Sequence, residues 1–139
     1  MNTLLELLNK AEYSLTLIKM LTPAWMAILF LQSGIDKVLN YKGNRAYLTA
    51  HFKNTPLSIF TPILIPTITF LEILSGILCA IGTFSLYMGN GKWAFMGLMC
   101  SAISLLCLFL GQRIAKDYGG AASLVPYFVL NVLGLLLLV

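Results

Sequence analysis

The sequence predicts an all-α, polytopic membrane protein: a four-helix bundle preceded by an N-terminal amphipathic helix in the membrane interface. Its composition is 59% hydrophobic and only 10% charged, whereas soluble domains carry about 25% charged residues. A membrane-spanning helix needs about 20 mostly apolar residues, and the 139 residues accommodate four such spans with short connections. We therefore expect residues 1–139 to form a single integral membrane domain.

Residues 1–21 allow two interpretations. Glu6 and Glu12 interrupt the apolar run and no small-residue cleavage site follows, so the segment does not have the pattern of a signal peptide. An amphipathic helix in the interface is one interpretation, because apolar residues share one helical face opposite Glu6, Lys10 and Tyr13; they are Leu4, Leu8, Ala11, Leu15 and Ile18. The other is an upstream extension of the first span, with Lys19 reaching toward the headgroups.

Prolines and a short polar segment mark the first two spans. Thr22 and Pro23 have the pattern of a capping residue followed by a proline at the first helical position, so we expect the first span at 22–39. Residues 43–60 mix aromatic and basic side chains, which is typical of a loop along the headgroups with one or two helical turns. The second span is expected at 62–87, with Pro66 bending its first turns.

Two glycine-containing junctions divide the rest of the chain. "MGNG" (88–91) is short enough to make its flanking spans antiparallel neighbours, which predicts a third span at 92–112. The Gly119–Gly120 pair is expected to stop that helix. The fourth span is then 121–139.

The distribution of basic residues predicts the orientation in the membrane. Alternating spans place six basic residues on one side, at Lys37, Lys42, Arg45, Lys53, Arg113 and Lys116. The other side receives Lys10, Lys19 and Lys92. The positive-inside rule then favours a cytoplasmic first loop and two termini outside the cytoplasm.

Charged residues inside the spans are the candidate functional residues. Glu72 lies ten residues after Pro62, which places it about 15 Å into a core about 30 Å thick. Alternating spans bring it to the same half of the bundle as a set of polar residues: Gln32, Asp36, Lys37, Gln112 and Arg113. These charges either neutralise one another or line a polar pocket for a lipid headgroup, a quinone ring or a partner's side chain.

Small residues at three- and four-residue spacing predict close helix packing. One stripe on the second span contains Thr69, Glu72, Gly76, Ala80 and Thr83, and one on the third contains Gly97, Cys100, Ser104, Cys107 and Gly111. In the fourth span, Ser123, Tyr127, Asn131 and Gly134 share a face. Asn131 is expected to form a hydrogen bond across helices, with contact to a ligand as the alternative.

Several chemistries have no support in the sequence. The three cysteines form no C-x-x-C pair, and Cys100 and Cys107 are two turns apart on one helix, too far for a disulfide. His51 is the single histidine, and no cluster has the pattern of a metal or iron–sulfur site. No catalytic motif stands out. The net charge of +4 indicates membrane topology and attraction to membrane lipids rather than nucleic acid.

Three segments resemble the DoxX family of small four-helix bacterial membrane proteins. They are "LFLQSGIDK" (29–37), "LEILSGILCAIG" (71–82) and "GQRIAKDYGGAASLVPY" (111–127), and the resemblance extends over about residues 20–139. It implies a multi-pass protein of the bacterial inner membrane, with Asp36, Lys37, Glu72 and Arg113 as the family-type polar residues. The family takes its name from a membrane subunit associated with a thiosulfate:quinone oxidoreductase.

Three functional hypotheses follow. The favoured one is an accessory or anchoring subunit of a larger, redox-linked membrane complex, bound to other membrane-protein subunits through helix faces and the basic loop. The alternative is a quinone- or lipid-binding component of an oxidoreductase with a Glu72/Arg113 pocket, although no cofactor can be assigned from the residues. A solute or proton carrier is disfavoured, because one charge cluster does not make a pathway to both sides.

Overall fold

The computed structural model describes all 139 residues and is built from helices alone. They are α1 (Asn2–Leu39), α2 (Tyr41–His51), the 3₁₀ helix η1 (Pro56–Ile59), α3 (Thr61–Tyr87), α4 (Lys92–Ile114) and α5 (Tyr118–Leu138). Four of them, α1, α3, α4 and α5, are long and apolar enough to cross a membrane. The all-α fold class with four candidate spans is therefore confirmed.

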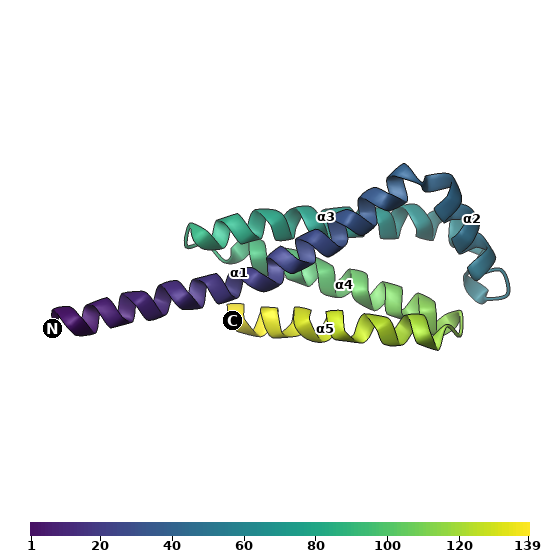
Figure 1. Cartoon of the computed structure of the whole chain (residues 1–139). Helices are drawn as coiled ribbons and strands as arrows, with labels where there is room; N and C mark the ends of the chain where they lie inside the picture. The colour runs from purple at the N-terminus through teal and green to yellow at the C-terminus, as the bar shows by residue number, and fades with distance from the viewer.

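The four long helices run in alternating directions and bring both termini to one end of the bundle (Figure 1). Helix α1 packs mainly on α3, α3 packs on α4, and α5 packs mainly on α4. Helices α1 and α5 have few contacts with each other, one of which joins Thr22 to Gly134. Helix α2 crosses the end of the bundle opposite the termini (Figure 1).

The core is small because each span buries only one side. Its apolar centre is formed by Met26, Phe30, Cys79, Leu98 and Leu105, which are at most 2% exposed. Many leucine, isoleucine and phenylalanine side chains are exposed on the outer surface of the bundle. This distribution suits a lipid environment, which requires no polar surface around the spans.

Helix α1 corrects the predicted boundary at residue 22. Thr22 and Pro23 are buried inside one continuous helix of 38 residues instead of starting a new one, so the structure contains the upstream extension and not a separate helix over 1–21. Contacts with neighbouring helices compensate for a proline inside a spanning helix. At about 1.5 Å per residue α1 is about 57 Å long, and its first turns extend past the other helices (Figure 1).

The predicted loop at 43–60 is more helical than expected. Eleven residues form α2, which has a basic and an apolar face, and η1 follows with Thr55 as its capping residue. The positions of Lys42, Arg45, Thr49 and Lys53 repeat at three- and four-residue intervals. That spacing is typical of one face of a helix. Contacts of His51 with Gln112 and of Phe52 with Gly111 hold the other face against the bundle, and the local pattern does not show these contacts.

The junction between α4 and α5 also differs from the prediction. Helix α4 continues to Ile114, and the chain turns at Lys116, whose φ is +60°. Gly119 and Gly120 lie in the first turn of α5 and do not stop a helix. The Asp117 carboxylate caps this turn by accepting a hydrogen bond from the Gly120 N–H at 2.8 Å, which the absence of a side chain at Gly120 permits.

Candidate functional site

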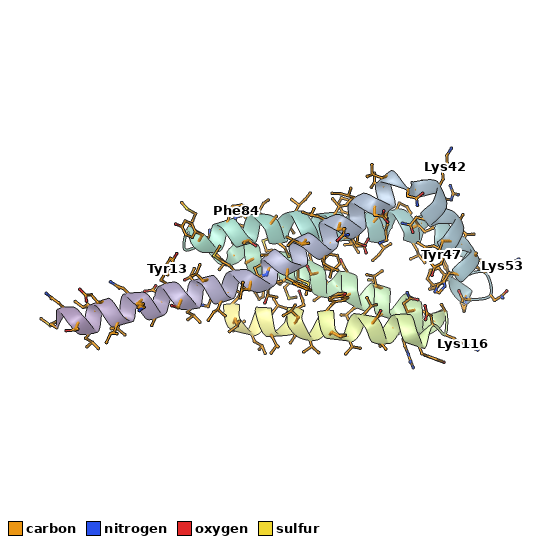
Figure 2. The ribbon with its side chains drawn as sticks, in the orientation of Figure 1. Tyr13, Lys42, Tyr47, Lys53, Phe84 and Lys116 are labelled. Atoms are coloured by element: carbon orange, nitrogen blue, oxygen red, sulfur yellow. The ribbon has the colours of Figure 1, made fainter.

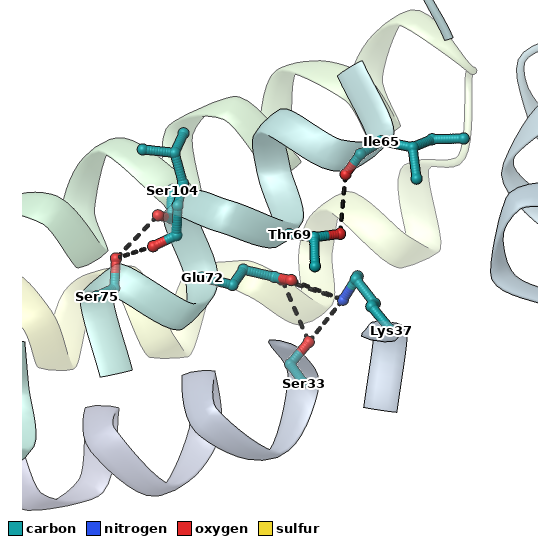
Figure 3. Close-up of polar contacts among 8 residues, drawn as sticks. Ser33, Lys37, Ile65, Thr69, Glu72, Ser75 and Ser104 are labelled. Carbon is teal, nitrogen blue, oxygen red and sulfur yellow. Dashed lines mark hydrogen bonds and ion pairs between the residues drawn. The ribbon is translucent and has the colours of Figure 1, made fainter. Parts of the chain in front are cut away.

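Helices α1 and α3 bring a base, an acid and a hydroxyl together inside the bundle. Ser33 and Lys37 lie one turn apart on α1 and face Glu72 on α3 (Figure 3). Gly76 allows the two helices to approach, since a Cβ at this position would lie 2.8 Å from the backbone nitrogen of Leu31. The Ser33–Lys37–Glu72 cluster is therefore a consequence of close packing between α1 and α3.

The three side chains of this cluster are bonded to one another. Lys37 Nζ lies 2.9 Å from Glu72 Oε2 and donates hydrogen bonds to Glu72 Oε1 at 3.1 Å and to Ser33 Oγ at 2.7 Å. Ser33 Oγ donates to Glu72 Oε1 at 3.2 Å. Oε2 has the ion pair but no well-aligned hydrogen bond. The charge of Glu72 is thus matched inside the protein, as a buried carboxylate requires.

The two charged partners differ in exposure. The Glu72 side chain is 2% exposed, whereas that of Lys37 is 18% exposed. The long Lys37 side chain can reach toward the headgroups, but the Glu72 carboxylate has no comparable route to water.

Four of the predicted site residues lie outside this cluster. Asp36 and Gln32 are exposed on the outer side of α1, because a step of about 100° separates Asp36 from Lys37 and only one of them can face α3. The Arg113 guanidinium lies 4.6 Å from the centre of the Tyr118 ring, and Gln112 contacts His51. The structure brings Lys37 and Glu72 into contact, whereas none of the other four predicted residues contacts Glu72.

The helix register explains why Arg113 does not reach Glu72. Ser75 pairs with Ser104 at 3.1 Å and Cys79 with Ser101 at 3.4 Å, so in these antiparallel helices Glu72 lies at the depth of about residue 107. Arg113 is six residues further along α4, or about 9 Å. A Glu72/Arg113 pocket does not form.

Ser33 is the cluster member that the sequence interpretation missed. It precedes Lys37 by four residues, the spacing that places two side chains on the same helical face. A search for hydroxyls one turn from the base would have found it.

A series of small polar side chains joins α3, α4 and α5 through the core. Besides the two pairs at Ser75 and Cys79, Asn131 donates from Nδ2 to the Leu98 carbonyl at 2.9 Å. The predicted cross-helix bond of Asn131 is confirmed, while its buried Oδ1 has no partner. Close packing by small residues is also confirmed, although Gly76 faces α1 and not α4, and Cys107 is exposed.

A second polar group connects α2 to the end of the bundle. His51 Nε2 lies 3.0 Å from Gln112 Oε1 and 3.9 Å from Asp117 Oδ2, and the His51 ring stacks on Tyr47. Phe52 packs against α4, 3.5 Å from where a Cβ of Gly111 would lie. These contacts hold α2 across the bundle end and leave its other face free.

The remaining surface features are two grooves. An open groove of about 570 Å³ lies over the basic face of α2, along Lys42, Arg45, Ala46, Thr49, Ala50 and Lys53. An apolar groove of about 160 Å³ lies between α4 and α5, lined by Leu105, Leu106, Phe109, Leu124, Val125 and Phe128. No group of three or more His, Cys, Asp or Glu side chains is arranged to hold a metal ion.

Comparisons of this chain with protein-family models, with curated proteins and with solved structures found no match. The resemblance to the DoxX family therefore remains a prediction. The structure supports a multi-pass, all-α membrane protein with an internally paired charge cluster and a basic helix across one end.

Proposed function

We propose that this protein is an accessory or anchoring subunit of a membrane complex, which it binds through the basic face of α2. The observation that carries the proposal is the exposure of Lys42 and Arg45 on α2 and of Lys53 in the turn that follows it, along one groove. The other side of α2 is fixed to the bundle. The partner that fits this face is an acidic surface of another protein.

The position of α2 supports a docking role. Lys42 and Lys53 extend away from the bundle end, and Lys116 lies at the same end (Figure 2). Arg113 is exposed there as well. Exposed basic side chains that no acid neutralises attract an acidic partner and favour one orientation of docking.

The internal charges support the same conclusion. The Glu72 carboxylate is bonded to Lys37 and Ser33, so binding a ligand there would break existing bonds in a low-dielectric environment. The cluster serves to join α1 to α3, and recognition is left to the surface.

The experiment compares two neutralised variants purified from native membranes in mild detergent. In the first, Lys42, Arg45 and Lys53 are changed to glutamine; in the matched control, Lys10, Lys19 and Lys92 at the opposite end are changed to glutamine. Lys37, Arg113 and Lys116 remain in the first variant, which leaves three basic residues on each side of the membrane. Because the positive-inside bias is then lost, labelling of an added Asn90→Cys must first show that the orientation is unchanged. We expect the amount of any protein that co-purifies in fixed ratio to fall at least about threefold in the α2 variant. Each exposed ion pair contributes about 0.2–1 kcal/mol, and three such pairs are lost.

The matched control should retain those proteins at the wild-type ratio. Equal recovery from wild type and the α2 variant would contradict docking through α2. If the purified protein has no stable partner but binds vesicles that contain anionic lipid, the basic face binds lipid headgroups instead.

A second candidate function rests on the groove between α4 and α5. Its six apolar side chains line about 160 Å³, room for one segment of a lipid acyl chain or of a quinone tail. This is the observation that favours the lipid- or quinone-binding alternative. Extraction of the purified protein and mass spectrometry test it: a quinone in stoichiometric amount supports the alternative, and loss of that quinone in Leu124→Trp would place it in the groove.

Redox linkage and location in the bacterial inner membrane both rest on the resemblance to the DoxX family. We propose them as the setting in which an anchoring subunit of this kind works. Co-purification of an oxidoreductase would support the first.

A further inference from the structure

We propose that two copies of this protein pair through parallel α1 helices, in register along one exposed stripe. The stripe, called the α1 stripe below, consists of positions spaced alternately by three and four residues: Leu4, Leu7, Ala11, Ser14, Ile18, Leu21, Trp25, Ile28, Gln32, Ile35 and Leu39. Every one of these residues is exposed in the single chain.

The Gln32 side chain is the first feature of the α1 stripe that indicates contact with another helix. It follows Leu31, which contacts Gly76 near the middle of α3, so Gln32 lies well inside the span. Its side chain is exposed, and it forms no hydrogen bond within the chain. A polar side chain facing hydrocarbon without a hydrogen-bond partner is costly, and such residues mark contacts between spanning helices.

The second feature is the set of exposed leucines at the N-terminal end of the α1 stripe. The N-terminal turns of α1 project beyond the bundle (Figure 1), where Leu4 and Leu7 are 62% and 63% exposed. A helix of about 57 Å is far longer than the ~30 Å hydrocarbon core. Lipid could cover the projecting leucines only if α1 tilted strongly. Such a tilt would still leave the Gln32 amide in the hydrocarbon core, without water to bond it.

A second α1 helix would both give Gln32 a hydrogen-bond partner and cover the projecting leucines. Two copies in the same orientation in one membrane have parallel α1 helices, so a two-fold axis along the membrane normal places Gln32 opposite the partner's Gln32. Each amide has both a donor and an acceptor, so the two side chains can bond reciprocally. The projecting leucines of the two copies then cover each other outside the bilayer.

The spacing and the charges of α1 fit this arrangement. An alternation of three and four residues is the repeat of a left-handed coiled coil, and Ala11 and Ser14 are small enough for close approach. The stripe has no charged residue. Of the flanking charges, Lys10 would face Leu15 of the partner subunit and Asp36 would face Leu31 of the partner subunit, so pairing brings no like charges together.

Disulfide cross-linking in native membranes tests the contact. In a Cys107→Ala background, which removes the exposed native thiol, we expect Leu7→Cys and Ile28→Cys to form dimers of this chain on mild oxidation. Asn9→Cys, on the opposite side of α1, and Val129→Cys, an exposed position on α5, are the matched controls and should remain monomeric.

Energy transfer between labelled copies in liposomes tests the role of Gln32. We expect Gln32→Leu to weaken dimerisation by about 3- to 30-fold, the range for hydrogen bonds between spanning helices, and Gln32→Asn to retain most of it. In dilute detergent, where the protein is monomeric, both variants should unfold at the wild-type temperature because Gln32 has no side-chain hydrogen bond within the chain. Wild-type protein that stays monomeric at all densities, equal cross-linking of the controls, cross-linking only to a different protein, or an unchanged Gln32→Leu dimer would overturn the proposal.

The dimer and the docking function can fail separately. Cross-linking measures the α1 contact whether or not a partner is bound to α2. The glutamine substitutions on the basic face of α2 do not change any residue of the α1 stripe.

Discussion

The ion pair between Lys37 and Glu72 shows how a single residue's environment sets the effect of its replacement. Both groups lie in one cluster, but only Lys37 is near enough to the surface to reach polar headgroups, with 18% of its side chain exposed against 2% for Glu72. If Glu72 is removed, the Lys37 ammonium can still reach the polar headgroups. If Lys37 is removed, the buried Glu72 carboxylate keeps only one hydrogen-bond partner, the Ser33 hydroxyl.

We expect this asymmetry in the stability of the two single variants. Lys37→Met should lower the free energy of unfolding by about 3–5 kcal/mol, the usual cost of leaving a buried charge without its partner. Glu72→Gln keeps an acceptor for both neighbours and should cost about 1–2 kcal/mol. Thermal and denaturant unfolding of the purified protein in detergent measures both values.

A charge exchange identifies the partner of Glu72. Glu72→Lys should prevent stable assembly, and adding Lys37→Glu should restore part of the yield. Adding Arg113→Glu should not, because Arg113 lies against Tyr118. Rescue by Arg113→Glu instead would contradict the cluster described here.

At the scale of helices, glycine and small polar residues set the distances between α3, α4 and their neighbours. A Cβ on Gly97 would lie 2.7 Å from the backbone nitrogen of Cys79, and Gly82 faces Ala94 in the same way. Because these contacts involve backbone atoms, no side-chain rotation can relieve them. The serine and cysteine pairs beside them form only at this short separation.

We expect Gly97→Ala to destabilise the bundle by about 1–3 kcal/mol, since added volume in a tight interface moves the backbone. Gly119→Ala is the matched control: its Cβ would meet only Asp117 Oδ1 at 3.8 Å, and alanine favours a helix by up to about 1 kcal/mol over glycine. The two substitutions should shift the unfolding temperature in opposite directions. A stabilising Gly97→Ala would show that α3 and α4 are further apart than described.

At the scale of the whole molecule, four spans put both termini on one side and the basic α2 on the other. The six basic residues near α2 and the α4–α5 junction favour the cytoplasm for that side. The projecting end of α1 and the α3–α4 turn then lie outside it. Any partner of α2 is therefore expected in the cytoplasm or at its membrane surface.

Labelling of introduced cysteines by a membrane-impermeant maleimide, compared with the unsubstituted Cys107→Ala protein, tests this orientation. In right-side-out vesicles with Cys107→Ala, Asn90→Cys in the α3–α4 turn should react at once, and Lys53→Cys beyond α2 should react only after permeabilisation. The reverse pattern would invert the topology. Reaction of both sites in sealed vesicles would contradict the number of spans.

The sequence by itself determined the class of this protein and most span limits. Hydrophobic length identifies spans directly, because every spanning helix must satisfy its own backbone and face lipid. The second span and the turn at 88–91 agree with α3 and its junction to within a residue, and the internal partner of Glu72 was predicted from the cost of burying a charge. These inferences depend on local composition and on the solvent that the membrane provides.

Only the tertiary structure decided which polar residues meet. Lys37 faces Glu72 while Asp36 and Gln32 face outward, because the rotation of α1 is set by close contacts of Leu31 with Gly76 and of Gly34 with Ile73. The depth of Arg113 relative to Glu72 depends on the register of α3 against α4. Pro23 continues a helix and Gly120 begins one because neighbouring helices and the Asp117 cap outweigh local preference. Rotation and register come from contacts between segments distant in sequence, so local patterns did not contain them.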